Sequence, residues 1–300
     1  MVPAPTPMAE TGLVVARFRR HALVEDPAGD VYDCQILGRR LRPVVGDNVE
    51  WRRDRDGSCI VQAVRSRNST LQRLNSRGRP EVVAANLSQL IVVLAPHPEP
   101  DWFLLDRYLC AAELAGLKAA IVFNKMDLVE NAPDTLDVYR NIGYRVVLTS
   151  AVDKTGLGEL EQLFGAERSA LIGQSGVGKS SLFNELLGEA VQRVGRLSGR
   201  LLQGRHTTTT SVLHRHPDGG EIIDSPGVRN YAPHIDRPAD VQLGFREFVA
   251  RRDQCRFDDC THRAEPDCAV KAALKEGIID GGRYGNYNRL YEQTFAARAY

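Results

Sequence analysis

One short stretch, residues 173–180, constrains the fold of this 300-residue chain more than any other. It reads GQSGVGKS and fits the pattern G-x-x-x-x-G-K-[ST]. A short apolar run precedes it at residues 169–172, and an apolar pattern with helical spacing follows it up to Leu187. A strand, a glycine loop and a helix in this order predict a P-loop. A Gly/Ser turn before an ordinary helix is the alternative, and it leaves the strand unexplained.

The residue types of this loop suit phosphate binding. Its glycines let backbone N–H groups surround phosphate oxygens, and the helix N-terminus adds favourable partial charge. Lys179 would reach the outer phosphates, and the Ser180 hydroxyl would hold Mg2+. The sequence therefore predicts a nucleoside triphosphate site made by Gly173, Gln174, Ser175, Gly176, Val177, Gly178, Lys179, Ser180 and Ser181.

Strand and helix patterns alternate in the middle of the chain. Residues 90–95 and 118–123 are continuous apolar runs, typical of strands buried on both faces. Asp101 can cap a helix that reaches about residue 115, and shorter helices are expected near 135–142 and 158–164. Repeated β-α units predict a mostly parallel sheet with helices on both faces.

A second motif, Asn124-Lys125-Met126-Asp127, directly follows the strand 118–123. The Asp127 carboxylate can accept both N–H donors on one edge of guanine, whereas adenine would leave it unpaired. Asn124 would contact the other edge of the base and tie this loop to the P-loop. Lys125 would lie along the nucleoside. The motif is weak alone, but beside a P-loop it predicts guanine binding.

The order of these motifs is inverted. Ser150 and Ala151, which follow the next strand, would complete the guanine site with the Ala151 N–H near O6. All of these base-reading residues precede the P-loop in the chain. The sequence therefore predicts a circularly permuted sheet, in which the last phosphate motif leads directly into the C-terminal region.

Two segments after the P-loop would complete the phosphate site. Asp224, in the D-x-x-G run at 224–227, would hold Mg2+ through a water, and the Gly227 N–H would contact the γ-phosphate. In the GRHTTTT segment, the hydroxyl of Thr208 or Thr209 would complete the Mg2+ shell.

Val228 stands where GTP-hydrolysing proteins often have a water-orienting Gln, so slow intrinsic hydrolysis is expected. His206 is our candidate for orienting the water, and a loop-ordering hydrogen bond is its alternative role. The expected catalytic set is His206, Lys179, Thr208, Thr209 and Gly227.

The N-terminal part has a different pattern. Four or five short strands in residues 11–66 predict a small barrel of the OB type, with many arginines in or beside the strands. This barrel could contact RNA or only pack against a neighbouring domain, and the sequence leaves both roles open. Residues 65–80 carry five arginines and no acidic residue, so they are expected to form an extended basic linker.

Half of the six cysteines cluster near the C-terminus, as Cys255-x4-Cys260-x-His262-x5-Cys268. Three thiolates and an imidazole make a tetrahedral donor set suited to one structural Zn2+. Iron is not excluded by the cysteines, but the mixed set favours zinc. Helices are expected near 241–249, 269–276 and 284–297, the last with tyrosines packed on one face.

Together these motifs resemble the ribosome small subunit-dependent GTPase A (RsgA) family: an Arg-rich barrel, NKMD before GQSGVGKS, GRHTTT, DSPG and the zinc spacing. The resemblance covers the chain from about residue 11. It implies a bacterial GTPase that uses GTP/GDP and Mg2+, and binds the 30S ribosomal subunit and its 16S rRNA late in maturation. It also implies that the subunit stimulates hydrolysis, which accompanies release.

We accordingly expect a multidomain protein. Its predicted parts are a disordered tail (1–10), an OB-type β-barrel (11–66), a basic linker (67–81), a circularly permuted α/β GTPase domain (82–232) and a mostly helical zinc-binding domain (233–300). No apolar run approaches the ~20 residues of a membrane span, so no membrane contact is expected. The resemblance implies a cytoplasmic protein, and we expect it to be a monomer. Two rivals remain: a GTP-dependent switch on another RNA, such as the 50S subunit or a tRNA, and a zinc-stapled scaffold with a vestigial nucleotide site.

Overall fold

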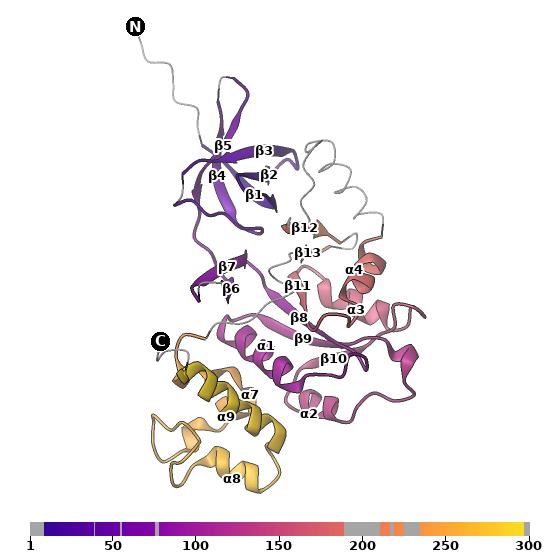
Figure 1. Ribbon diagram of the computed structural model, residues 1–300, viewed down its shortest axis with the longest axis vertical. Helices are drawn as coiled ribbons and strands as arrows, with labels where there is room; N and C mark the ends of the chain where they lie inside the picture. The colour runs from indigo at the N-terminus through magenta and orange to yellow at the C-terminus, as the bar shows by residue number, and fades with distance from the viewer. Residues whose placement is uncertain are drawn as a thin grey trace. The chain divides into compact units, whose positions relative to one another are not determined.

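The computed structural model describes residues 9–38, 40–54, 56–75, 78–188, 211–216, 219–224 and 235–296 (Figure 1). The chain divides into two compact units. Unit 1 consists of Met1–Ser88, Glu161–Leu171 and Ser180–Tyr231, and unit 2 of Gln89–Leu160, Ile172–Lys179 and Ala232–Tyr300. Three elements run across the division: α3 (Leu157–Phe164), β11 (Arg168–Ile172) and α4 (Lys179–Leu187).

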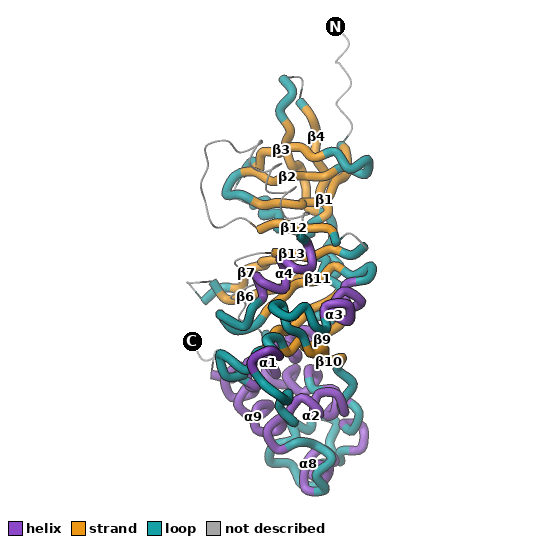
Figure 2. The backbone as a smooth tube through the Cα atoms, turned by 90° about the vertical axis from the view of Figure 1, so that its right-hand side faces the viewer, coloured by secondary structure: helices purple, strands orange, loops and turns teal. Residues whose placement is uncertain are grey.

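Unit 1 begins with a five-stranded barrel (Figure 2). The strands lie in the order β1-β2-β3-β5-β4, and β4 pairs again with β1, which closes the barrel. Alternating small and branched apolar side chains point inward around the buried Trp51. The expected barrel is confirmed, with these bounds: β1 (Glu10–Arg17), β2 (His21–Glu25), β3 (Val31–Ile36), β4 (Asn48–Arg53) and β5 (Cys59–Val64).

The segment after the barrel is more ordered than an extended linker. β6 (Thr70–Leu74) pairs antiparallel with β7 (Pro80–Ala85) in a separate two-stranded sheet, and Leu71 is buried. At Gly46, φ is +90°, and a Cβ atom would lie 2.1 Å from the Ala85 carbonyl oxygen. Only glycine therefore allows the loop before β4 to approach the end of β7 this closely.

The rest of the sheet in unit 1 contains a strand that the sequence pattern did not indicate. β12 (Ser211–Arg215) pairs antiparallel with both β13 (Glu221–Asp224) and β1. β13 in turn runs parallel to β11. Val212 lies opposite Ala16 on one side and Asp224 on the other. The barrel strand β1 is thus one strand away from the strand that ends in Asp224.

Unit 2 contains a parallel sheet in the order β10-β9-β8, as expected from the β-α pattern. Its strands are β8 (Gln89–Leu94), β9 (Lys118–Phe123) and β10 (Arg145–Leu148), joined by α1 (Trp102–Leu114) and α2 (Thr135–Asn141). The Asp101 side chain accepts from the Leu104 N–H at 2.9 Å, which confirms the predicted helix cap. The loops that follow these strands come together at one edge of the sheet.

The C-terminal part of unit 2 is mostly helical, with an aromatic core around Phe245, Phe248 and Tyr287. α8 (Ala269–Lys275) and α9 (Gly281–Ala296) lie close to the expected helices. The single helix predicted at 241–249 is wrong. A 3-10 segment, η2 (Pro238–Gly244), is followed by the short α7 (Arg246–Val249) and by η3 (Arg252–Gln254). In the part of the chain that the structure describes, no helix has the length and apolarity to cross a membrane.

Candidate functional site

The P-loop begins where β11 ends, and residues 172–179 belong to unit 2. At Gly173, φ is +141° and a Cβ would lie 2.1 Å from the Val93 carbonyl oxygen, so the loop can pass the end of β8 only with glycine. The Lys179 ammonium donates to the carbonyl oxygens of Gly173 at 2.8 Å and Gln174 at 2.5 Å. The lysine side chain therefore lies over its own loop, where an ammonium can neutralise phosphate charge.

Asn124 joins the guanine motif to the P-loop. Its side chain is 1% exposed, and its Nδ2 donates to the Val177 carbonyl oxygen at 3.0 Å. The Thr149 hydroxyl donates to its Oδ1 at 3.1 Å, so the amide is held from both sides. Beside it, a Cβ on Gly178 would come within 2.3 Å of Asn124 Nδ2. The two motifs meet in one unit, although they lie in reversed order along the chain.

The remaining base-reading residues are held by short polar contacts. Lys125 has the left-handed φ of 62°, and its Nζ donates to the His97 carbonyl oxygen at 2.8 Å. The Ser150 hydroxyl donates to Asp127 Oδ1 at 2.6 Å. This bond fixes the rotamer of the exposed Asp127 carboxylate while leaving its other oxygen for a ligand.

The two predicted magnesium ligands lie in unit 1. Asp224 is the last residue of β13, and Ser180 lies in the first turn of α4. The predicted catalytic residues His206, Thr208, Thr209 and Gly227 lie outside the described residues.

Two contacts of this site were missed in the sequence. The Asp101 N–H donates to Gln174 Oε1 at 3.2 Å, and the Thr149 hydroxyl bonds Asn124. The threonine could have been found, because it stands directly before the Ser150-Ala151 pair at the end of a strand. No local signal marks the bond between Asp101 and Gln174, because 73 residues separate them.

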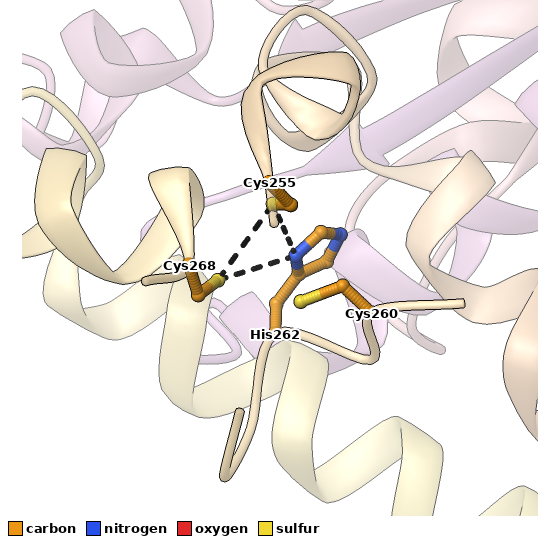
Figure 3. Close-up of side chains that lie close together, drawn as sticks. All are labelled: Cys255, Cys260, His262 and Cys268. Atoms are coloured by element: carbon orange, nitrogen blue, oxygen red, sulfur yellow. Dashed lines mark hydrogen bonds between the residues drawn. The ribbon is translucent and has the colours of Figure 1, made fainter. Parts of the chain in front are cut away.

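A second site lies in the C-terminal region, where Cys255, Cys260, His262 and Cys268 place their ligand atoms within 4.8 Å of one another (Figure 3). The two sulfurs of Cys255 and Cys268 are 4.0 Å apart, and His262 Nδ1 is 3.5 Å and 3.4 Å from them. Tetrahedral Zn2+ bonds imply about 3.8 Å between sulfurs and about 3.6 Å between sulfur and nitrogen. The cluster is therefore compatible with zinc.

Hydrogen bonds to the backbone hold this cluster in shape. Burial would raise the pKa of Glu265, but bonds from the Thr261 hydroxyl and amide and the Arg263 amide lower it to about 2. The Tyr284 hydroxyl donates to the His262 carbonyl oxygen at 2.7 Å. Burial raises the pKa of the Cys260 thiol to about 12, so a bound cation would be needed to keep it as a thiolate.

These features define a class of protein. A P-loop follows the guanine motif instead of preceding it, a five-stranded barrel comes first, and a Cys3His cluster lies in the helical C-terminal region. This combination is that of a circularly permuted P-loop GTPase.

Comparisons with known proteins give the family. A family model described as RsgA GTPase matches residues 64–233. The "Small ribosomal subunit biogenesis GTPase RsgA" of Pseudomonas fluorescens Pf-5 is 44% identical over 291 residues, which cover 94% of this chain and 84% of that protein. Its namesake in Pseudomonas putida F1 is 43% identical over the same shares of the two chains. The chain therefore belongs to the RsgA GTPase family.

Solved structures agree with this assignment. YjeQ from Thermotoga maritima has 32% sequence identity and a TM-score of 0.74, with 96% of this chain and 99% of that chain covered. A structure described as YloQ, a circularly permuted GTPase, has 27% identity and the same TM-score, with 96% of each chain covered. The fold class predicted from the sequence is confirmed.

Proposed function

We propose that this protein hydrolyses GTP during late maturation of the small (30S) ribosomal subunit, and that the subunit stimulates the hydrolysis and is released with it. One observation carries the proposal: Asn124 links the guanine motif to the P-loop by a 3.0 Å hydrogen bond. This bond holds the base-reading loop against the P-loop, which supports the binding of one guanine nucleotide by both loops. The names of the relatives, which are small-subunit biogenesis GTPases, support the choice of partner.

The base side of the pocket would be made by one short loop and the end of the next strand. Asp127 would accept from the two donors on the edge of guanine, with Ser150 fixing its rotamer. The Ala151 N–H would contact O6, and Lys125 and Met126 would lie beside the nucleoside.

The phosphate side would be made by the whole loop 173–181. Backbone N–H groups would surround the phosphates, and Lys179 would neutralise their charge. Ser180 and Asp224 would hold Mg2+, directly and through a water respectively. Mg2+ would supply charge neutralisation of the β- and γ-phosphates.

The C-terminal cluster would hold one structural Zn2+. Its four donors leave no open position, so the ion would stabilise the fold and take no part in hydrolysis. The expected boundaries, with a barrel at 11–66, a basic segment at 67–81, a GTPase domain at 82–232 and a zinc domain at 233–300, belong to the same proposal. The arginines of the barrel would contact 16S rRNA, and the protein would act in the cytoplasm as a monomer.

Turnover of GTP by the purified protein, alone and with 30S or 50S subunits, tests this function. We expect slow turnover alone and strong stimulation by 30S subunits only. Lys179→Ala is the control, because it should abolish stimulated turnover while the barrel stays intact. Stimulation by 50S subunits and not by 30S would favour the alternative, a switch acting on another RNA.

We also propose that His206 orients the attacking water, since Val228 cannot do so. His206→Ala should then keep its affinity for GTP and lose most of the stimulated turnover. Full stimulated turnover in this variant would leave His206 with the loop-ordering role only.

A further inference from the structure

Helix α1 lies beside α9 of the C-terminal region (Figure 1), and one stripe of its side chains contacts that region. The stripe consists of Phe103, Asp106, Cys110 and Glu113, and this spacing places them on one helix face. Phe103 lies under the Arg289 guanidinium at 3.9 Å, and Glu113 accepts from Arg246 at 2.7 Å. The helix is therefore shared between the nucleotide-binding sheet and the C-terminal helices.

The centre of this stripe is a buried group of charges. Arg283 of α9 is 2% exposed and donates to Asp106 at 2.5 Å and to both oxygens of Glu247 at 2.8 and 2.9 Å. Asn286 donates to Asp106 Oδ2 at 2.6 Å, and Tyr139 donates to Oδ1, which also accepts from Arg283, at 2.9 Å.

These bonds fix the position of the group and favour the charged form of Arg283. Burial alone would lower the pKa of Arg283, but the carboxylates of Asp106 and Glu247 outweigh it and raise the pKa above its usual value. Every oxygen of the two carboxylates accepts a hydrogen bond, so neither side chain can turn without leaving a buried charge unpaired. Helix α9 therefore holds α1 in one position along its axis.

The first turn of the same helix contacts the P-loop. The Asp101 carboxylate caps α1 through the Leu104 N–H, and the Asp101 N–H donates to Gln174 Oε1 at 3.2 Å. The Lys179 ammonium lies on the Gln174 carbonyl oxygen at 2.5 Å. A shift of α1 along its axis would therefore pull on the phosphate-binding loop through one side chain.

We propose that Gln174 is a positioning residue of the P-loop, and that the buried contact between Asp106 and Arg283 sets its position through α1. The inference rests on nucleotide binding at the P-loop, which is part of the proposed function. It adds that the C-terminal region tunes guanine nucleotide affinity through α1. Proximity alone does not establish this coupling. It must be measured as an interaction free energy between the Asp106–Arg283 contact and the Asp101–Gln174 contact.

A double-mutant cycle tests the proposal, with the dissociation constant of a fluorescent GDP analogue as the readout. Gln174→Met keeps the side-chain length and removes the acceptor, and Asp106→Asn removes the buried charge and keeps the shape. Loss of one hydrogen bond corresponds to about two- to tenfold in affinity, and we expect each variant to weaken binding within this range. The dissociation constant of the double variant should be at most about twofold higher than that of the weaker-binding single variant. The reason is that both changes interrupt the same connection between Arg283 and the P-loop through α1.

Two results would overturn the proposal: unchanged affinity in Asp106→Asn, or effects that multiply in the double variant. Asp137→Asn is the matched control, because Asp137 pairs with Arg140 on the exposed surface of α2 and should leave affinity unchanged. If Asp106→Asn does not fold, Asn286→Ala replaces it, since this side chain donates to the same carboxylate. Guanine nucleotide binding by the unmodified protein is measured first. If the unmodified protein does not bind, the proposed function fails. If it binds, the variants test only the coupling between the C-terminal region and the P-loop.

Discussion

The C-terminal helices and the N-terminal barrel are each held within their own unit, but in different ways. The C-terminal region of unit 2 meets α1 through side chains, with Arg283 and two carboxylates buried at the centre. The barrel of unit 1 meets β12 through the backbone, since β1 pairs with it at Ala16 and Arg17. The first attachment depends on a few residues, whereas the second depends on strand geometry that most side chains permit.

The ion pairs beside these attachments show the same contrast. In unit 1, Arg215 donates to Glu25 at 2.6 Å, but its side chain is 53% exposed. In unit 2, the side chain of Arg283 is 2% exposed and its partners are 1% and 5% exposed. Water can replace Glu25 as the partner of Arg215, while nothing can replace Asp106 and Glu247. A single substitution of Arg283 should therefore reduce the free energy of unfolding more than a single substitution of Arg215.

Loss of the metal should give the largest effect, confined to the C-terminal region. In Cys268→Ser one ligand is lost, and structural zinc sites contribute on the order of 10 kcal/mol to folding. We expect amides of α8 and α9 to lose their protection from hydrogen exchange, while amides of the barrel strands β1–β5 keep theirs. Cys34→Ser in the barrel core is the control, and it should not change the zinc content. Protected C-terminal helices in a zinc-free Cys268→Ser protein would contradict the metal's structural role.

Arg283→Met should be the most damaging single change of a charged residue. It leaves the carboxylates of Asp106 and Glu247 buried without their cation, which costs about 3–5 kcal/mol. Denaturant unfolding of the zinc-loaded protein measures the loss. Arg289→Met, which removes the exposed cation above Phe103, should cost about 1 kcal/mol or less. Equal losses of unfolding free energy in the two variants would mean that the buried ion pairs of Arg283 contribute no more to stability than the exposed cation of Arg289.

Arg215→Met should have the smallest effect. The Arg215 side chain is 53% exposed and that of Glu25 is 13% exposed, so water reaches the pair from the arginine side, and pairs near the surface contribute about 0–1 kcal/mol. The same unfolding experiment applies, and the loss should shrink further in high salt. A loss comparable to that of Arg283→Met would show that the barrel, too, is attached mainly through side chains.

The sequence predicted the elements whose signals are local. The cap of α1 at Asp101 and the helix α8 were found because each depends on neighbouring residues. The helix expected at 241–249 failed for a tertiary reason. Phe245 has an extended backbone (φ −117°, ψ 101°) that separates η2 from α7, and the segment packs so closely on α1 that a Cβ at Gly244 would lie 2.2 Å from Cys110 Sγ.

For the candidate site, the motifs indicated the chemistry but not the contacts that support it. Asn124 and Asp127 stood out by type and spacing, whereas Gln174 was expected only as one residue of the phosphate-binding loop, with no partner outside it. Its bond to Asp101 spans 73 residues, and that of Arg283 to Asp106 spans 177. Contacts of this separation follow from the packing of α1, which no local pattern contains.

The nucleotide preference of Asp127→Asn tests the central claim most directly, namely that the inverted motifs form one guanine-reading pocket. An amide in place of the carboxylate can donate to the C2 oxygen of xanthine but cannot accept from both donors of guanine. We predict that GTP affinity falls by a few kcal/mol, on the order of 100-fold or more, and that the variant prefers XTP. Unchanged preference for GTP over XTP and ATP would contradict the account.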